Sequence, residues 1–196
     1  MIDKEHGGYV DAHVHVWSND LQNYPLGHGF TVQDMNPAVY LPNQILHDAQ
    51  PWGVDRVVLV QMSYYGFDNS FMLEAIKHSP KVFRGIAIVD GKGEGTEVQM
   101  RSLAGQGIRG FRLYPEEVTL SVLGGEGYRK MFRCGAEERL AICLLMNPNS
   151  LADLERHCQD FPDTPVVVDH LARIGIYDKV VSRMQWIIFF VHLNCF

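Results

Sequence analysis

The segment Asp11-Ala12-His13-Val14-His15 places two imidazoles two residues apart, near the end of a run that we interpret as a buried β-strand. Side chains alternate across a strand, so Asp11, His13 and His15 share one face while the apolar residues share the other. Two such histidines lie about 6.5–7 Å apart along the strand, close enough to bind one metal ion or one substrate. Each could instead be an ordinary core or surface residue, but the pairing favours the functional interpretation.

Polar residues also stand where the other predicted strands end. Gln61, Ser63 and Tyr65 follow the second strand, Asp90 the third, Arg112 the fourth, Asn147 the fifth and Asp169-His170 the sixth. In a parallel α/β barrel these ends lie on one face, so the residues would meet around one pocket. There His170 could serve as general base, hydrogen-bond donor or metal ligand, or it could simply orient a loop.

The fourth predicted strand carries two arginines on opposite faces, Arg109 and Arg112. An arginine that points into a pocket suits a carboxylate substrate, because its guanidinium donates two parallel hydrogen bonds. An arginine that points outward is a surface residue whose stem covers apolar groups. The strand pattern does not say which face is inward, so either residue could bind the anion.

Strand-like and helix-like segments alternate along the chain and would position these residues. Strands are predicted at 10–15, 56–62, 83–89, 108–113, 140–146 and 166–170, and helices at about 36–50, 70–79, 96–105, 127–139 and 150–160. The third helix opens with a capping-box pattern at Thr96, and the last buries Leu151, Leu154 and Cys158 at helical spacing. The alternation predicts an α/β fold built from parallel βαβ units, with the loop 18–35 over the carboxyl ends of the strands.

Six βα units are recognisable, whereas a closed barrel of eight needs about 250 residues. We therefore predict an incomplete TIM-barrel-like domain over residues 1–173, followed by an atypical apolar tail over 174–196. The run 184–196 is shorter than the roughly 20 residues that a membrane span requires. It is expected to cover a sheet edge, to mediate self-association or to have no structural role.

Composition narrows the class of protein. The chain has 196 residues, 46% hydrophobic and 20% charged, which is typical of a globular protein. A net charge of -6 and the absence of a basic run argue against a nucleic-acid partner. The polar N-terminus lacks the apolar region of a signal peptide, which favours a cytoplasmic location. Four cysteines show no C-x-x-C spacing, and Cys143 and Cys158 are predicted to be buried thiols.

Four motifs together resemble the amidohydrolase-related (amidohydrolase 2) family of TIM-barrel hydrolases and decarboxylases. They are Asp11-Ala12-His13-Val14-His15, the stretch 61–69 (QMSYYGFDN), the stretch 107–112 (GIRGFR) and Val168-Asp169-His170. The 61–69 stretch looks most like the lactonase branch, which includes 2-pyrone-4,6-dicarboxylate lactonase. The similarity covers about residues 8–173.

The resemblance implies roles for the matching positions. His13, His15 and His170 would be catalytic and would polarise the scissile carbonyl. Ser63, Tyr65 and Asn69, with Arg109 or Arg112, would bind the substrate. The implied reaction is hydrolysis of a small carboxylated or sugar-derived lactone.

The resemblance leaves alternatives open for metal dependence and for activity. Family decarboxylases bind Zn²⁺ through the H-x-H pair, here His13 and His15, together with a further His and an Asp after strand eight. Strand five here ends at Asn147, a poor zinc ligand, which favours the metal-independent lactonase branch. The water-activating Asp has no counterpart in the six recognised units. The alternatives are a metal-dependent decarboxylase, an inactive isoform that only binds a ligand or partner, and a non-functional truncated product.

Overall fold

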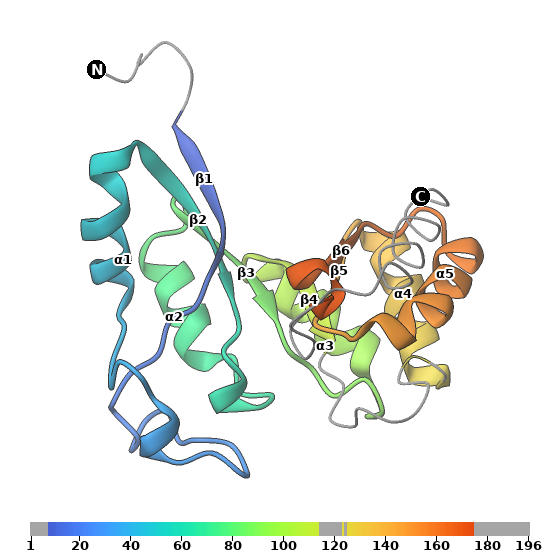
Figure 1. The fold of residues 1–196 in the computed structure, drawn as a ribbon, viewed down its shortest axis with the longest axis horizontal. Coiled ribbons are helices and arrows are strands. Elements are labelled where there is room, and N and C mark those ends of the chain that lie inside the picture. Colours follow the sequence, from blue (N-terminus) through green and yellow to red (C-terminus); the bar gives the residue numbers. More distant parts are fainter. Residues whose placement is uncertain (1–7, 114–122, 124, 175–196) are drawn as a thin grey trace. The chain divides into compact units, whose positions relative to one another are not determined.

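The computed structural model describes residues 8–113, 123 and 125–174. They form two compact units. The first contains the residues up to Ile88 together with Leu103–Arg109, and the second contains Val89–Ser102 and the residues from Gly110 onward. Strands and helices alternate along the chain in both units (Figure 1).

The strands are β1 (Tyr9–Val14), β2 (Val54–Val60), β3 (Phe83–Ala87), β4 (Ile108–Leu113), β5 (Ala141–Leu144) and β6 (Val166–Val168). The α-helices are α1 (Pro42–Ala49), α2 (Ser70–His78), α3 (Thr96–Gly105), α4 (Glu126–Glu138) and α5 (Leu151–Asp160). The strands follow one another in chain order, and β1 to β3 and β4 to β6 pair in parallel. The predicted α/β, TIM-barrel-like succession of six strands is thereby confirmed.

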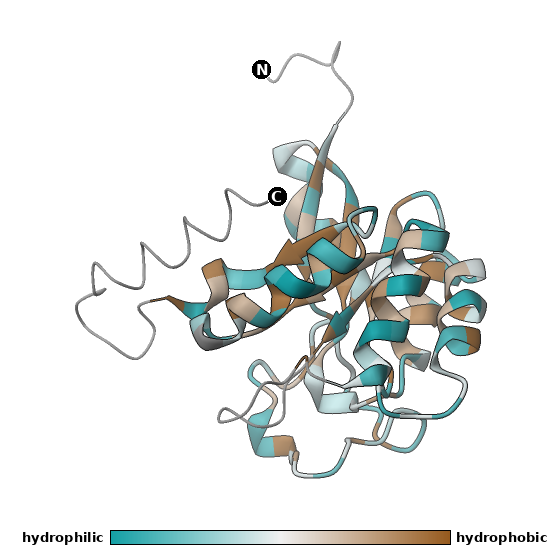
Figure 2. Cartoon of the chain, turned by 90° about the vertical axis from the view of Figure 1, so that its right-hand side faces the viewer, coloured by the Kyte–Doolittle hydropathy of each residue, from teal (hydrophilic) through white to brown (hydrophobic). Residues whose placement is uncertain are grey.

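The core of the first unit lies between its strands and α2. Helix α2 buries Met72, Ala75 and Ile76, as its spacing predicts. At Gly85 on β3, an added Cβ would lie 2.5 Å from Ile108 Cδ1 and 2.9 Å from Ile76 Cδ1, so glycine permits this close packing. In Figure 2, hydrophobic residues (brown) are prominent on the strands, whereas the helices carry both hydrophobic and hydrophilic residues.

The first strand is less buried than predicted. Tyr9 is 61% exposed and Val10 is 47% exposed, and only the last two residues of β1 are partly covered. The physical reason is position, because β1 lies at the end of the strand order and pairs only with β2 among the described strands. Its pairing register also shifts between Asp11 and Val14, the segment that contains His13.

The start of one helix and the cap of another differ from the prediction. Helix α1 begins at Pro42 rather than near residue 36, because proline suits the first turn of a helix and the Leu41 N–H is satisfied by Gln44 Oε1 at 2.7 Å. The capping box at Thr96 is wrong. The Thr96 hydroxyl donates instead to the carbonyls of Asp90 and Gly93, both at 2.8 Å, and this ties the preceding loop to the helix.

The core of the second unit gathers the strands β4 and β5 against α4 and α5. The fully buried members are Phe111, Met131, Phe132, Ile142, Leu144, Leu151 and Leu154. The predicted burial of Cys158 is wrong, because that thiol is half-buried and His157 takes the inner position. The His157 ring stacks on Phe132 with centroids 4.6 Å apart, and its Nε2 lies 2.6 Å from the Leu123 carbonyl.

The last described strand is only partly covered. Three consecutive valines are typical of a buried strand, yet Val167 of β6 is 47% exposed. Strand β6 pairs with β5 alone in the described part of the sheet, so one edge has no strand beside it. The apolar tail falls within residues 175–196 and lies outside the described residues. Among the described helices, none is long and apolar enough to cross a membrane.

Candidate functional site

The two histidines of the first strand lie against each other. His13 is in β1 and His15 follows it directly, and their ring centroids are 5.0 Å apart in an edge-to-face arrangement. The Asp11 carboxylate accepts a hydrogen bond from the His13 backbone N–H at 3.3 Å. Both rings are partly buried. The first unit thus brings two imidazoles to the carboxyl end of a strand as one cluster.

A backbone contact fixes the orientation of the His15 ring. Its Nδ1 lies 2.8 Å from the carbonyl oxygen of Val60, the last residue of β2. A carbonyl oxygen can only accept, so Nδ1 carries the proton and the lone pair of the neutral ring lies on Nε2. This arrangement orients Nε2 to accept a proton or to bind a cation.

The loop after His15 packs on the segment after β2, as predicted for residues 18–35. Trp17, Met35, Tyr64 and Tyr65 form a buried cluster, flanked by partly buried residues that include Tyr24, Phe30 and Phe71. Within it, the Tyr65 hydroxyl accepts a hydrogen bond from Ser18 N–H at 2.8 Å. Tyr65 is 3% exposed, and burial raises the pKa of its hydroxyl. The hydroxyl therefore anchors the loop in this structure.

Asn69 and Gln61 hold the segment 61–69 in place from its two ends. The Asn69 amide donates to Ile88 O at 2.8 Å and accepts from Ile88 N–H at 3.0 Å, so it pairs with the backbone just after β3. Gln61 donates to the Asp68 carbonyl and is 2% exposed. Ser63 begins the short 3₁₀ turn Ser63–Tyr65 between them and is half-buried. The structure thus gives Asn69 a structural task in addition to the predicted contact with substrate.

Arg112 on β4 forms a buried ion pair in the second unit. Its Nε donates to Asp169 Oδ2 at 3.1 Å, and the two side chains are 6% and 4% exposed. Burial lowers the Arg112 pKa, and the Asp169 carboxylate opposes that shift. Cys143 pairs with Arg112 in the strand register, and burial raises the pKa of its thiol to about 12. A guanidinium, a carboxylate and a neutral thiol therefore share one desolvated patch.

The structure separates the two arginines that the sequence left as alternatives. Arg109 is exposed, and its Nη1 donates to the carbonyls of Ala104 at 3.0 Å and Ile108 at 2.7 Å. Arg112 is buried, as is every other residue of β4 except Arg109, so both faces of the strand are covered from Gly110 onward. Of the two arginines, Arg112 is therefore the one that lies in the core.

His170 begins an unusual stretch of backbone. His170, Leu171, Ala172 and Arg173 all have φ between 51° and 56°, the left-handed region that non-glycine residues rarely adopt. Each such residue costs roughly 1–2 kcal/mol, and strained segments of this kind cluster at functional sites. The turn keeps Asp169 buried and leaves His170 exposed.

Two functional candidates were missed as site residues by the sequence reasoning. Asp169 is expected among the polar residues at the strand ends but without a role of its own, although a buried Arg112 requires a nearby counter-charge, and an acid at a strand end is the signal for one. Asn147 is likewise expected at a strand end and is otherwise considered only as a poor zinc ligand. Its Oδ1 is buried and accepts no hydrogen bond from the described residues, which makes it an acceptor available to a donor group.

The described residues do not complete a metal site. His13 and His15 supply two imidazoles, and the backbone bond at His15 Nδ1 is typical of a metal-binding histidine. A protein zinc site needs three or four ligands, however, and no group of three His, Cys, Asp or Glu side chains suited to a metal occurs among the described residues. We therefore derive no chemical step through a metal ion.

Comparison with solved structures places this arrangement among known folds. The probable 2-pyrone-4,6-dicarboxylic acid hydrolase of Acinetobacter baumannii, crystallised with citric acid, is 24% identical with a TM-score of 0.76; the match covers 96% of this chain and 67% of that one. The Pseudomonas putida protein given the same provisional name is 21% identical with a TM-score of 0.69, over 97% and 77% of the two chains. These likenesses show the fold.

A third solved structure is an amidohydrolase of Burkholderia multivorans with bound zinc. It is 17% identical with a TM-score of 0.72, and the match covers 95% of this chain and 64% of that one. The model of the Amidohydro_2 amidohydrolase family matches residues 10–191, which include the histidine pair and the Asp169-His170 turn. The chain therefore belongs to this amidohydrolase family.

Proposed function

We propose that the chain is a hydrolase that opens a small carboxylated or sugar-derived lactone. The observation that carries the proposal is the imidazole pair at the end of β1, in which Val60 fixes the tautomer of His15. Family membership and the fold shared with two provisionally named pyrone-dicarboxylate hydrolases support it. The buried guanidinium of Arg112 supports the carboxylated class of substrate.

The proposed reaction is addition of water to the lactone carbonyl, followed by cleavage of the ring C–O bond to give a hydroxy acid. A neutral His15 can accept the water proton at Nε2, and the imidazolium so formed can donate that proton to the ring oxygen as the C–O bond breaks. His13 touches this ring and is proposed to share the role. His170, on its strained turn, is proposed as a further orienting group.

Arg112 is proposed to bind the substrate carboxylate. Its Nε is taken by Asp169, which leaves the two Nη groups as a fork for a second carboxylate. Ser63, Tyr65 and Asn69, in the segment 61–69, are proposed to bind the rest of the substrate. Arg109 is not retained in this role because its own side chain is exposed.

A panel of carboxylated and sugar-derived lactones tests the proposal, with hydroxy-acid formation as the readout. Each assay is run after treatment with chelator and again after addition of zinc, so that the metal requirement is measured directly. Saturable ring opening of at least one lactone is the expected result. Release of carbon dioxide from an aromatic carboxylate would assign the decarboxylase alternative, and ligand-induced stabilisation without turnover would assign a binding role.

A further inference from the structure

A cavity lies in the first unit, apart from the histidine pair. It measures about 920 Å³ and is lined by α2, the start of β3 and the turn between α3 and β4. The strand residues that border it, Arg84 and Arg109, stand near the amino ends of β3 and β4. His15 instead follows the carboxyl end of β1. The cavity is thus a separate feature, large enough for a small organic molecule.

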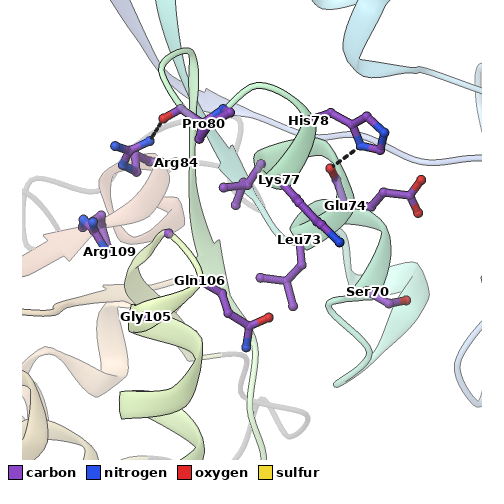
Figure 3. A pocket seen from close by; sticks show the side chains of 12 residues that line it. Ser70, Leu73, Glu74, Lys77, His78, Pro80, Arg84, Gly105, Gln106 and Arg109 are labelled. Carbon is purple, nitrogen blue, oxygen red and sulfur yellow. Dashed lines mark hydrogen bonds between the residues drawn. The ribbon is translucent and has the colours of Figure 1, made fainter.

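The cavity is positively charged in an acidic protein. Its charged lining residues are Lys77, Arg84, Arg109 and Glu74, a net charge of +2 in a chain whose formal charge is -6. Figure 3 shows Arg84 and Arg109 on one side of the cavity and the α2 side chains Leu73, Glu74 and Lys77 on the other. A local field of this sign attracts anions.

The two guanidiniums are anchored in a way that leaves a binding edge. Arg84 Nη1 donates to the carbonyls of Pro80 and Phe83, and Arg109 Nη1 donates to those of Ala104 and Ile108. For both residues these bonds use Nη1 only, so the Nε–Nη2 edge has no partner among the described residues. That edge is the fork that receives a carboxylate or phosphate with two parallel hydrogen bonds. Because the backbone bonds already restrict each side chain, little rotamer freedom remains to be lost on binding.

The rest of the lining defines the body of the ligand. Leu73, Ile76 and Pro80 contribute apolar surface, and Gln106 contributes an amide. We propose that this cavity binds a small organic oxyanion, with its carboxylate or phosphate group on Arg84 and Arg109 and its apolar body against α2. The site is independent of the proposed lactonase chemistry, in which Arg109 is not retained and no other lining residue takes part.

Isothermal titration of the whole chain with benzoate and, separately, with inorganic phosphate tests the proposal. Saturable binding that weakens as salt is raised is expected. Preference for benzoate would identify the apolar wall as part of the site, and preference for phosphate would identify the oxyanion alone as the ligand. Arg109→Gln and Lys77→Ala should each weaken binding, the arginine by about tenfold or more.

Three further variants keep the test independent of folding and of the histidine site. Glu74→Gln removes the negative charge and should strengthen binding about two- to fivefold, a gain that a damaged fold cannot produce. Arg56→Gln, an arginine of β2 outside the cavity, should leave the affinity unchanged. His15→Ala should also leave it unchanged, whatever happens to lactone hydrolysis. No saturable binding, or equal affinity in the Arg109, Glu74 and wild-type proteins, would overturn the proposal.

Discussion

His15, Arg112 and Asn69 illustrate three ways in which the surroundings of one residue set its chemistry. A single backbone carbonyl decides which nitrogen of His15 carries the lone pair. A single carboxylate makes it possible for Arg112 to stay charged at 6% exposure. The Asn69 amide forms its hydrogen bonds with the backbone of Ile88, so Asn69 affects the site by fixing the position of the loop.

The buried ion pair of Arg112 should be worth far more than the exposed pairs of the chain. Arg112→Met leaves the Asp169 carboxylate buried beside an apolar side chain, which we expect to lower the free energy of unfolding by about 3–5 kcal/mol. Arg101→Met, which breaks exposed bonds to Glu137 and Glu138, should cost roughly 0–1 kcal/mol. Urea unfolding of both variants gives the comparison, and equal losses would show that burial does not govern the pair.

The thiol of Cys143 should make stability depend on alkaline pH. Its folded pKa is raised from 9.0 to about 12, because burial favours the neutral form. The stabilisation is therefore complete below about pH 9 and is lost as the pH rises from about 9 towards 12. The free energy of unfolding, measured with denaturant from pH 8 to 11, should fall more steeply for the wild type than for Cys143→Ala. Parallel pH profiles for the two proteins would contradict this.

Asn69 should prove to be a stability residue as well as a site residue. Asn69→Ala leaves the backbone groups of Ile88 without their side-chain partner, and we expect a loss of about 1–3 kcal/mol of unfolding free energy. Asn23→Ala, at an exposed loop position, serves as the matched control and should cost well under 1 kcal/mol. If both asparagines behave alike in chemical denaturation, the bridge between the 61–69 segment and β3 contributes nothing.

At the scale of elements, close backbone approach decides where glycine is required. Gly127 in the first turn of α4 faces the carbonyl of Gly91, and an added Cβ would collide with it. Gly105 at the end of α3 has nothing within 4 Å of the same position. The two residues are both helical glycines, yet only one of them fixes a contact between segments.

Alanine substitution at these two glycines gives a matched test of that contact. Gly105→Ala should be neutral or stabilise the protein by about 0.4–1 kcal/mol, because alanine restricts the unfolded chain. Gly127→Ala should destabilise it by about 1–3 kcal/mol, because the loop at Gly91 or the helix must shift. Thermal unfolding monitored by circular dichroism distinguishes them. A stabilising Gly127→Ala would show that α4 does not pack on that loop.

At the scale of the whole molecule, the sequence predicted the succession of elements well because their signals are local. The spacing of Met72, Ala75 and Ile76 is enough to predict the buried face of α2. The failures arise where distant residues decide. The exposure of Tyr9 and Val167 depends on which strands lie beside them. The Thr96 hydroxyl donates to two loop carbonyls instead of capping its own helix.

The sequence predicts which residues belong to the candidate site better than it predicts their hydrogen-bond partners. The spacing of His13 and His15 indicates a pair, but nothing in the segment points to the carbonyl of Val60, 45 residues further on. Strand alternation put Arg109 and Arg112 on opposite faces, and only the packed β4 shows which one is buried. Burial and long-range hydrogen bonds are properties of the fold, so they appear only once the strands are paired.

Catalysis by His15 is tested most directly by the value of kcat/KM for lactone hydrolysis in three proteins. These are the wild type, His15→Ala, and His47→Ala, whose imidazole is exposed on α1. The wild type and His47→Ala should open the same lactone at equal rates, while His15→Ala should be about 10²–10⁴-fold slower. Equal rates in all three proteins would show that His15 does not act in catalysis, and no ring opening by the wild type on any lactone of the panel would contradict lactone hydrolysis itself.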